Sequence, residues 1–467
     1  MPNSEQFYLA ILGTLICLMG FLRWPHSSLE LSRPRFIVPL IIWMATFYQI
    51  FWRYYSGSGR LTSNLGEYRQ QFGAQAEIYI IACILAFWVG FGLFHFDGLA
   101  NRLNRAAIIQ FHLDDNKLLS WSLWLAIIVV ASTTLLIGPD AIWNNASQSS
   151  VYGITWIHFS SYNVVLKIFR QFIDTLFTIA SAAMLGLGWP VKEQRNGMHY
   201  LIGATILIFT SIPFAADFSR GTGLPVVVAI AVYAFKRRRI LWSSAAIGAI
   251  WTIIVMNVAL YGRGNFGHYA GLYPWGQQFL ITLGTILNGD FSKMLTTINV
   301  LIDALTPTSV CMAGMNAGHT LGRMSLTNWL LYQLPYPHFL LPTVKYTVNA
   351  TRFLGGVGHW GYTSSAFGEA WIEFQWFGFI PFIFMGMVYR FIDRLAGIDQ
   401  MSRTDTISFF VLMLPISYIA MYLGMFSDFR SWWTVTAFGF YFLAGSIYLK
   451  NQFGHYSADF IGEGESI

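Results

Sequence analysis

Four basic residues in this sequence have the chemistry to bind a phosphate group. A guanidinium group binds phosphate oxygens in bidentate geometry and stays charged in a partly dry site. Arg220 and Arg263 are each followed by a glycine, which lets a phosphate approach the backbone closely, and Lys345 and Arg352 come later in the chain. Any one of them has an ordinary alternative, a side chain that extends to lipid head groups or, for Arg220, a pair with Asp217. We therefore base the prediction of a phosphate-binding site on the four residues together and not on any one of them.

His359 and Glu369 are the candidates in this chain for accepting a proton in a reaction. Glu369 and Glu373 are four positions apart, so they share one face of a helix. A carboxylate at membrane depth usually faces a cavity or a partner. For Glu369, a role in positioning or in a pair with an arginine is favoured over a role in catalysis. Near a helix start, the helix dipole would also stabilise this carboxylate, which is a purely structural role. His359 lies in the glycine-rich stretch 355–361, and it is a candidate proton shuttle because of these neighbours, although a lone loop histidine is more often a surface residue.

The composition indicates that lipid is the solvent around these residues. The 467 residues are 55% hydrophobic and only 11% charged, whereas a soluble domain carries about 25% charged residues. The apolar residues come in blocks long enough for membrane helices, which need about 20 residues. We therefore predict an all-α integral membrane protein, a single domain over 1–467 with about eleven transmembrane helices. Their approximate ranges are 7–23, 36–55, 76–95, 119–138, 164–188, 200–215, 222–236, 240–260, 364–389, 406–425 and 432–449.

The charge and the cysteines exclude other classes of protein. The net charge of +6 comes from basic residues dispersed at the ends of apolar blocks, which is not the pattern of a nucleic-acid-binding protein. Cys17, Cys83 and Cys311 have no metal or disulfide spacing and are predicted to be packing residues. No spacing resembles a zinc site, so we predict no metal and no cofactor. The first apolar block lacks a basic run before it and a cleavage site after it, so we expect a retained span.

The basic residues also predict the orientation of the spans. Short loops rich in lysine and arginine stay in the cytoplasm, and the strongest such cluster is 236–239. Each span changes the side of the membrane, so counting the spans from this cluster places Arg35, Arg390 and the C-terminus inside. It places the N-terminus and the four phosphate-binding candidates outside.

One long segment, about 261–363, is predicted on the outer face between the eighth and ninth spans. Apolar residues recur in it at helical spacing, which predicts an amphipathic helix or, as the alternative, another pair of spans. These residues are Leu280, Leu283, Leu287, Phe291, Met294, Ile298, Leu301 and Leu305.

In combination, several segments resemble the O-antigen polymerases and related polymerases of oligosaccharide repeat units. The segments are Ser219-Arg220-Gly221, Arg263-Gly264, Pro335-Tyr-Pro337, Pro342-Thr-Val-Lys345, Ser364-Ser365-Ala-Phe-Gly368-Glu369 and Phe377-Gly378. The likeness covers about residues 200–390, whereas residues 1–199 match only as generic spans. Some family members carry a glycine eleven positions after an outer-loop arginine. Here Ala231 and Pro274 stand at those positions, so the substrate-binding roles tied to that spacing do not transfer.

The resemblance implies an enzyme of the bacterial inner membrane. Such enzymes move a growing glycan from its undecaprenyl-pyrophosphate carrier to a hydroxyl of an incoming lipid-linked repeat unit on the outer face, without a nucleotide sugar. The three arginines would hold the departing pyrophosphate, Lys345 would add positive charge, and His359 or Glu369 would take the acceptor proton. The implied partners are lipid-linked oligosaccharides, the bilayer, a flippase and a chain-length regulator.

Two other functions stay open at the level of the sequence. An O-antigen ligase has a similar layout, and the sequence separates it poorly from a polymerase. A flippase or exporter of lipid-linked oligosaccharides also needs many spans and basic residues, but it should carry charged residues inside its spans. The spans predicted here are mostly free of charge, which favours an enzyme that works at one surface.

Overall fold

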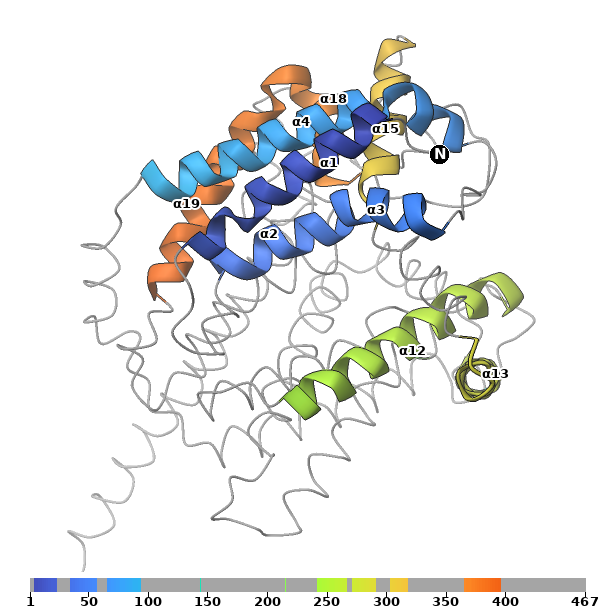
Figure 1. The fold of residues 1–467 in the computed structure, drawn as a ribbon. Helices are drawn as coiled ribbons and strands as arrows, with labels where there is room; N and C mark the ends of the chain where they lie inside the picture. Colours follow the sequence, from blue (N-terminus) through green and yellow to red (C-terminus); the bar gives the residue numbers. More distant parts are fainter. Residues whose placement is uncertain are drawn as a thin grey trace, which may run out of the picture. The chain divides into compact units, whose positions relative to one another are not determined.

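The computed structural model of the chain describes residues 4–22, 34–56, 65–93, 143, 215, 242–266, 271–290, 303–317 and 365–395. Every regular element in these ranges is a helix (Figure 1). The chain divides into two compact units. The first unit is formed by Met1–Arg102, Gly289–Gln400 and Val411–Trp432, and the second by Leu103–Asn288, Met401–Phe410 and Trp433–Ile467.

Three helices in the described ranges are long and apolar enough to cross a membrane. They cover Ser4–Leu22, Tyr68–Leu93 and Ala366–Met387, with 19, 26 and 22 residues. These helices coincide with the predicted spans 7–23, 76–95 and 364–389, so the described part agrees with an all-helical membrane protein. Two shorter apolar helices, Val38–Trp52 and Ala246–Gly262, fall on the predicted spans 36–55 and 240–260. The other predicted spans lie outside the described residues, apart from Ala215.

The first two predicted spans form an antiparallel pair. Helix α1 (Ser4–Cys17) continues as the 3-10 helix η1 (Leu18–Leu22), and the second span consists of α2 (Pro34–Ala45) and α3 (Phe47–Ser56). Trp43 Nε1 donates to Thr14 Oγ1 at 3.0 Å, and the rings of Phe7 and Phe51 lie 5.5 Å apart. The later residue of α1 thus contacts the earlier residue of the second span, so the two spans run in opposite directions, as expected for consecutive spans.

The predicted second span is interrupted at Thr46, between α2 and α3. The Thr46 hydroxyl donates to the Ile42 carbonyl at 2.6 Å, a side-chain bond that competes with the helical ladder and bends helices. The N–H of Gln49, which a continuous helix would direct to the Ala45 carbonyl, bonds instead to the Thr46 carbonyl at 3.2 Å. The Ala45 carbonyl accepts from the backbone N–H of Ala304 at 2.8 Å. The break therefore leaves a backbone carbonyl that accepts a hydrogen bond from Ala304, the residue directly before the helix Leu305–Asn316.

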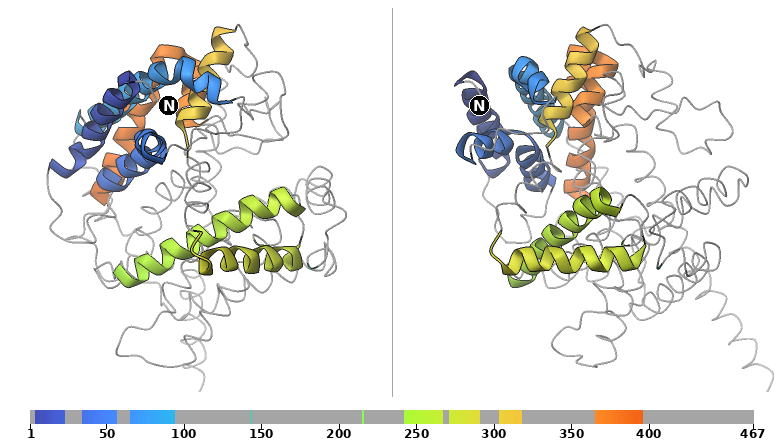
Figure 2. Two further views of the ribbon diagram at one scale, coloured as in Figure 1. Left: turned by 45° about the vertical axis from the view of Figure 1, so that its right-hand side comes forward. Right: turned by 90° about the vertical axis from the view of Figure 1, so that its right-hand side faces the viewer.

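Helix α4 (Leu65–Leu93) lies between α1 and α19 (Ile380–Leu395), as Figure 2 shows. Gln6 Nε2 donates to the Arg69 carbonyl at 3.4 Å, and Trp88 Nε1 donates to the Ile16 carbonyl at 3.0 Å. The earlier residue of α1 contacts the earlier residue of α4, and the later contacts the later, so the two helices run in the same direction. The order of the first three predicted spans requires this arrangement.

Helix α4 also runs parallel to the broken helix made by α18 (Ala366–Phe374), η4 (Gln375–Phe379) and α19. The rings of Tyr79 and Trp371 are 5.0 Å apart, and the Arg390 guanidinium lies 5.3 Å from the ring centre of Phe91. A side chain at Gly90 or Gly386 would overlap the backbone of the opposite helix. Small residues that let two backbones approach closely are the usual basis of helix packing in membranes.

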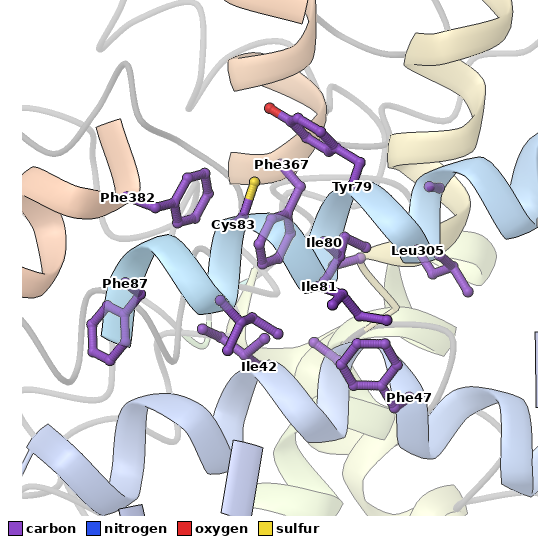
Figure 3. Close-up of a cluster of buried hydrophobic side chains, with 14 of the residues drawn as sticks. Ile42, Phe47, Tyr79, Ile80, Ile81, Cys83, Phe87, Leu305, Phe367 and Phe382 are labelled. Atoms are coloured by element: carbon purple, nitrogen blue, oxygen red, sulfur yellow. The ribbon is translucent and has the colours of Figure 1, made fainter. Parts of the chain in front are cut away.

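The apolar core of the first unit is built around α4. In Figure 3, Ile42 of α2 and Phe47 of α3 lie beneath Ile80 and Ile81 of α4. On another side of the cluster, the rings of Phe367 and Phe382 stack with centres 5.1 Å apart. The core thus joins helices from both ends of the sequence.

In the second unit, the structure describes a hairpin of two helices, α12 (Trp242–Phe266) and α13 (Leu272–Leu287). Asn265 Nδ2 donates to Gln278 Oε1 at 3.0 Å across the turn. Helix α13 ends at Leu287, where Asn288 N–H bonds to the Gly284 carbonyl and Gly289 has φ +79°. Of the apolar residues that predicted an amphipathic helix, Leu280, Leu283 and Leu287 lie in α13, and this turn ends the helix after Leu287. Phe291, Met294, Ile298 and Leu301 lie outside the described residues.

Candidate functional site

Glu369 is the predicted site residue that the structure describes fully. It lies in the first turn of α18 and is 3% exposed. His359, Arg220, Arg352 and Lys345 lie outside the described residues. Arg263 lies within α12, which continues to Phe266, so the backbone there is helical where the sequence predicted the start of a loop.

The start of α18 is fixed by hydroxyl groups from two elements. Ser365 caps the helix, and its Oγ accepts the N–H of Gly368 at 3.0 Å. The same Oγ lies 2.8 Å from Thr308 Oγ1, on α15 (Leu305–Asn316). The backbone of Ser365 has φ +64° and ψ 153°, a conformation that costs a non-glycine residue about 1–3 kcal/mol. Thr308 therefore helps to hold a strained residue about one helical turn before Glu369.

Glu369 faces the same neighbour, α15. A side chain at Gly368 would meet Cys311 Sγ at 2.9 Å, so α18 lies close against α15 at this point. Burial raises the pKa of the Cys311 thiol above its ordinary value, and the nearby Glu369 carboxylate raises it further. The thiol is thus a neutral, buried neighbour of the acid.

Helix α18 is bounded at both ends by strained residues. Ser365 and Gln375, with φ +51°, are the two non-glycine residues with positive φ in the described ranges. Between them Glu369 and Glu373 are both buried, with 3% and 6% of their surface exposed. Strained backbone of this kind concentrates at functional sites. The predicted sharing of a helix face by the two acids is compatible with this geometry, since α18 is helical at both positions.

A buried ion pair lies on the neighbouring elements. Arg69 Nη1 of α4 is 3.6 Å from Asp303 Oδ2, and the two side chains are 9% and 3% exposed. Asp303, directly before the N-cap residue Ala304, also accepts the N–H groups of Leu305 and Thr306 at 3.0 and 3.2 Å, so its carboxylate satisfies the start of α15. Arg69 was not predicted from the sequence, because it lies before the predicted third span. The signal for Asp303 was an acid directly before an apolar helix.

A second carboxylate missed by the sequence analysis is Glu77 of α4. It is fully buried, and neither oxygen has a hydrogen-bond partner in the part of the chain that the structure describes. Glu77 lies inside the predicted span 76–95, so this span contains an ionisable residue. An acid within an apolar block is itself the signal that could have found it.

The basic residues near α2 and α19 lie at the other end of the first unit. A side chain at Gly20 would overlap the Arg35 carbonyl and meet Trp88, while Arg390 lies over Phe91. Arg69 is instead near the start of α4, beside Gln6. The described part of the first unit therefore has Arg35 and Arg390 at one end and Arg69 at the other.

The described residues contain no group of three or more histidine, cysteine, aspartate or glutamate side chains arranged to hold a metal ion. No family model, no curated protein and no solved structure matches the chain.

Proposed function

We propose that this chain is a polymerase of undecaprenyl-pyrophosphate-linked oligosaccharide repeat units on the outer face of the bacterial inner membrane. The proposal includes about eleven spans, with the N-terminus outside and the C-terminus inside. It is supported by the three apolar helices of membrane-spanning length and by the resemblance of residues 200–390. A flippase and a chain-length regulator are the proposed partners.

The observation that carries the proposal is the fixed and buried position of Glu369. This acid follows a residue with positive φ whose hydroxyl is bonded to Thr308 of another helix. It also falls in a segment that carries the resemblance. A carboxylate held in this way is suited to orient an acceptor sugar hydroxyl, because a general base must keep its distance to the proton that it removes.

The proposed reaction is a glycan transfer. A hydroxyl of the incoming unit attacks C1 of the first sugar of the growing chain, the C1–O bond to pyrophosphate breaks, and the hydroxyl proton passes to Glu369 or His359. Undecaprenyl pyrophosphate leaves with the bonding electron pair. Arg220, Arg263 and Arg352, with Lys345, stabilise its negative charge. Since pyrophosphate is already the leaving group, the reaction as proposed needs neither a metal nor a cofactor.

The test is genetic, with the surface glycan run on a gel. Deletion of a polymerase gene leaves single-repeat chains, deletion of a ligase gene leaves none attached, and deletion of a flippase gene traps repeat units inside. We expect single-repeat chains. Arg220→Ala and Glu369→Gln should give the same pattern at normal protein levels in the membrane. Wild-type chain lengths from Arg220→Ala would remove Arg220 from the site, and the same result from Glu369→Gln would leave His359 as the base.

An exporter of lipid-linked oligosaccharides is the second candidate, and one observation favours it. Glu77, Glu369 and Glu373 are buried within helices of membrane-spanning length, and charged residues inside spans are typical of transport pathways. This weakens the argument from charge-free spans. Trapping of repeat units inside cells of the deletion strain would select this function over polymerisation.

A further inference from the structure

Glu77 has no role in the proposed reaction, yet it occupies the middle of the apolar contact between α4 and α1. On α4 it lies one turn after Gly73 and three turns before Trp88, so the three positions share a helix face. Gln6 of α1 fills the space beside Gly73, and Trp88 donates to the Ile16 carbonyl of α1. Glu77 therefore lies on the side of α4 that α1 covers.

The surroundings of Glu77 do not suit a charge. Its side chain is 0% exposed, and both carboxylate oxygens lack a hydrogen-bond partner among the described residues. An ionised carboxylate without partners in an apolar interior is very costly, and a group in that position takes up a proton instead. The contrast with Asp303 is direct, because that acid has an arginine, two N–H groups and a hydroxyl.

The charged groups that act on Glu77 do not offset this cost. Among the described residues they are Arg69, two turns earlier on α4, and Glu5 on α1. Arg69 forms its ion pair with Asp303, and the exposed Glu5 has the same charge as an ionised Glu77. Gln6, which follows Glu5 on α1, directs its amide N–H to the Arg69 carbonyl.

We propose that Glu77 is a proton-binding site inside the membrane domain, occupied by a proton while α1 packs on α4. The proton makes the carboxyl neutral, which allows the surrounding apolar side chains to close over it. Release of the proton requires α1 to separate from α4 at this level, so that water reaches the carboxylate. This inference does not depend on the polymerase proposal, because it rests on burial and hydrogen bonding alone.

The direct test is infrared spectroscopy of the purified full-length protein in lipid at about pH 7, well above the ordinary glutamate pKa of about 4.3. A protonated carboxyl has a C=O stretch separate from that of a carboxylate. We expect this band in the wild type and its loss in Glu77→Gln. Glu5→Gln is the matched control and should keep the band, because Glu5 is exposed. A wild-type spectrum without any intensity that Glu77→Gln removes would overturn the proposal.

A second measurement covers the case in which the glutamine variant folds poorly. A neutral acid without partners can be replaced by an apolar side chain of similar length at little cost. Glu77→Met should therefore insert normally and melt at or above the wild-type temperature. A large drop in melting temperature for both Glu77→Met and Glu77→Gln would mean that the carboxylate is ionised and paired, and the proposal would be wrong.

Discussion

Arg69 and Asp303 form an ion pair 3.6 Å long in the interior of the first unit, and 233 other residues separate them in the sequence. The pair connects the start of α4 to the start of α15. Asp303 also accepts the first two N–H groups of α15, so one carboxylate both neutralises the arginine and satisfies the helix end. Loss of this residue should affect two helices at once.

Asp303→Asn should destabilise the protein by about 3–5 kcal/mol, because it removes the carboxylate charge of a buried ion pair and leaves the Arg69 charge in place. Thermal unfolding in detergent measures the loss. The double variant Arg69→Met/Asp303→Asn is the control and should recover much of the stability, since both charges of the pair are gone. Equal stability of the single and double variants would show that the pair is not energetically coupled.

Ser365→Gly should be tolerated better than Ser365→Ala. Both variants lose the hydroxyl that bonds to Gly368 and Thr308, but glycine adopts φ +64° and ψ 153° without strain. We expect a difference of about 1–3 kcal/mol between the two melting curves. If alanine proved equal to glycine here, the strained conformation would not exist in solution.

Thr308→Val should lower glycan polymerisation by a larger factor than it lowers stability. The valine keeps the shape of the side chain but removes the 2.8 Å bond to Ser365, which fixes the start of α18. Thr285→Val in α13 is a control that removes an exposed hydroxyl bonded only within its own helix. Chain lengths on a gel, with protein levels from a membrane blot, separate the two effects.

Gly386→Ala should weaken the packing of α19 on α4, because the new methyl group would overlap the Phe87 carbonyl. Gly92→Ala is the matched control: a methyl group there meets nothing within 4 Å. We expect a lower melting temperature for Gly386→Ala alone. Identical melting curves would place α19 elsewhere than against α4.

Single cysteines at the ends of α4 test its crossing of the membrane. Gln70 and Leu93 are both exposed, and the native cysteines described by the structure are buried. A membrane-impermeant maleimide should label Gln70→Cys in intact spheroplasts. It should label Leu93→Cys only after the membrane is opened. Labelling of both from outside would mean that α4 does not span.

The apolar blocks of the sequence predicted the helices of the first unit well, because hydrophobic length is a local property. The breaks at Thr46 and Gln375 were missed, since each depends on contacts with other helices or on backbone strain. The parallel course of α4 and α18–α19 requires an odd number of crossings between Leu93 and Ser365 if both helices span. The five predicted spans in this interval meet that requirement.

The sequence was less informative about the site. Glu369 was predicted as an acid at membrane depth, four positions before Glu373, and the structure describes it as buried in the first turn of α18. Arg69 and Asp303 were not linked, because no local pattern connects residues so far apart in the chain. Glu77 was passed over because hydropathy averaged over a span conceals a single acid within it.

The glycine contacts between α4 and α19 have a consequence for biosynthesis. The ribosome completes α1 to α4 long before it reaches residue 365, so Gly90 and Phe87 of α4 remain without their final neighbour during most of translation. Until α19 is inserted, lipid or an insertion chaperone must occupy that face. A nascent chain stalled before α18 should therefore remain associated with the insertion machinery, whereas release of the full chain should follow insertion of its later helices.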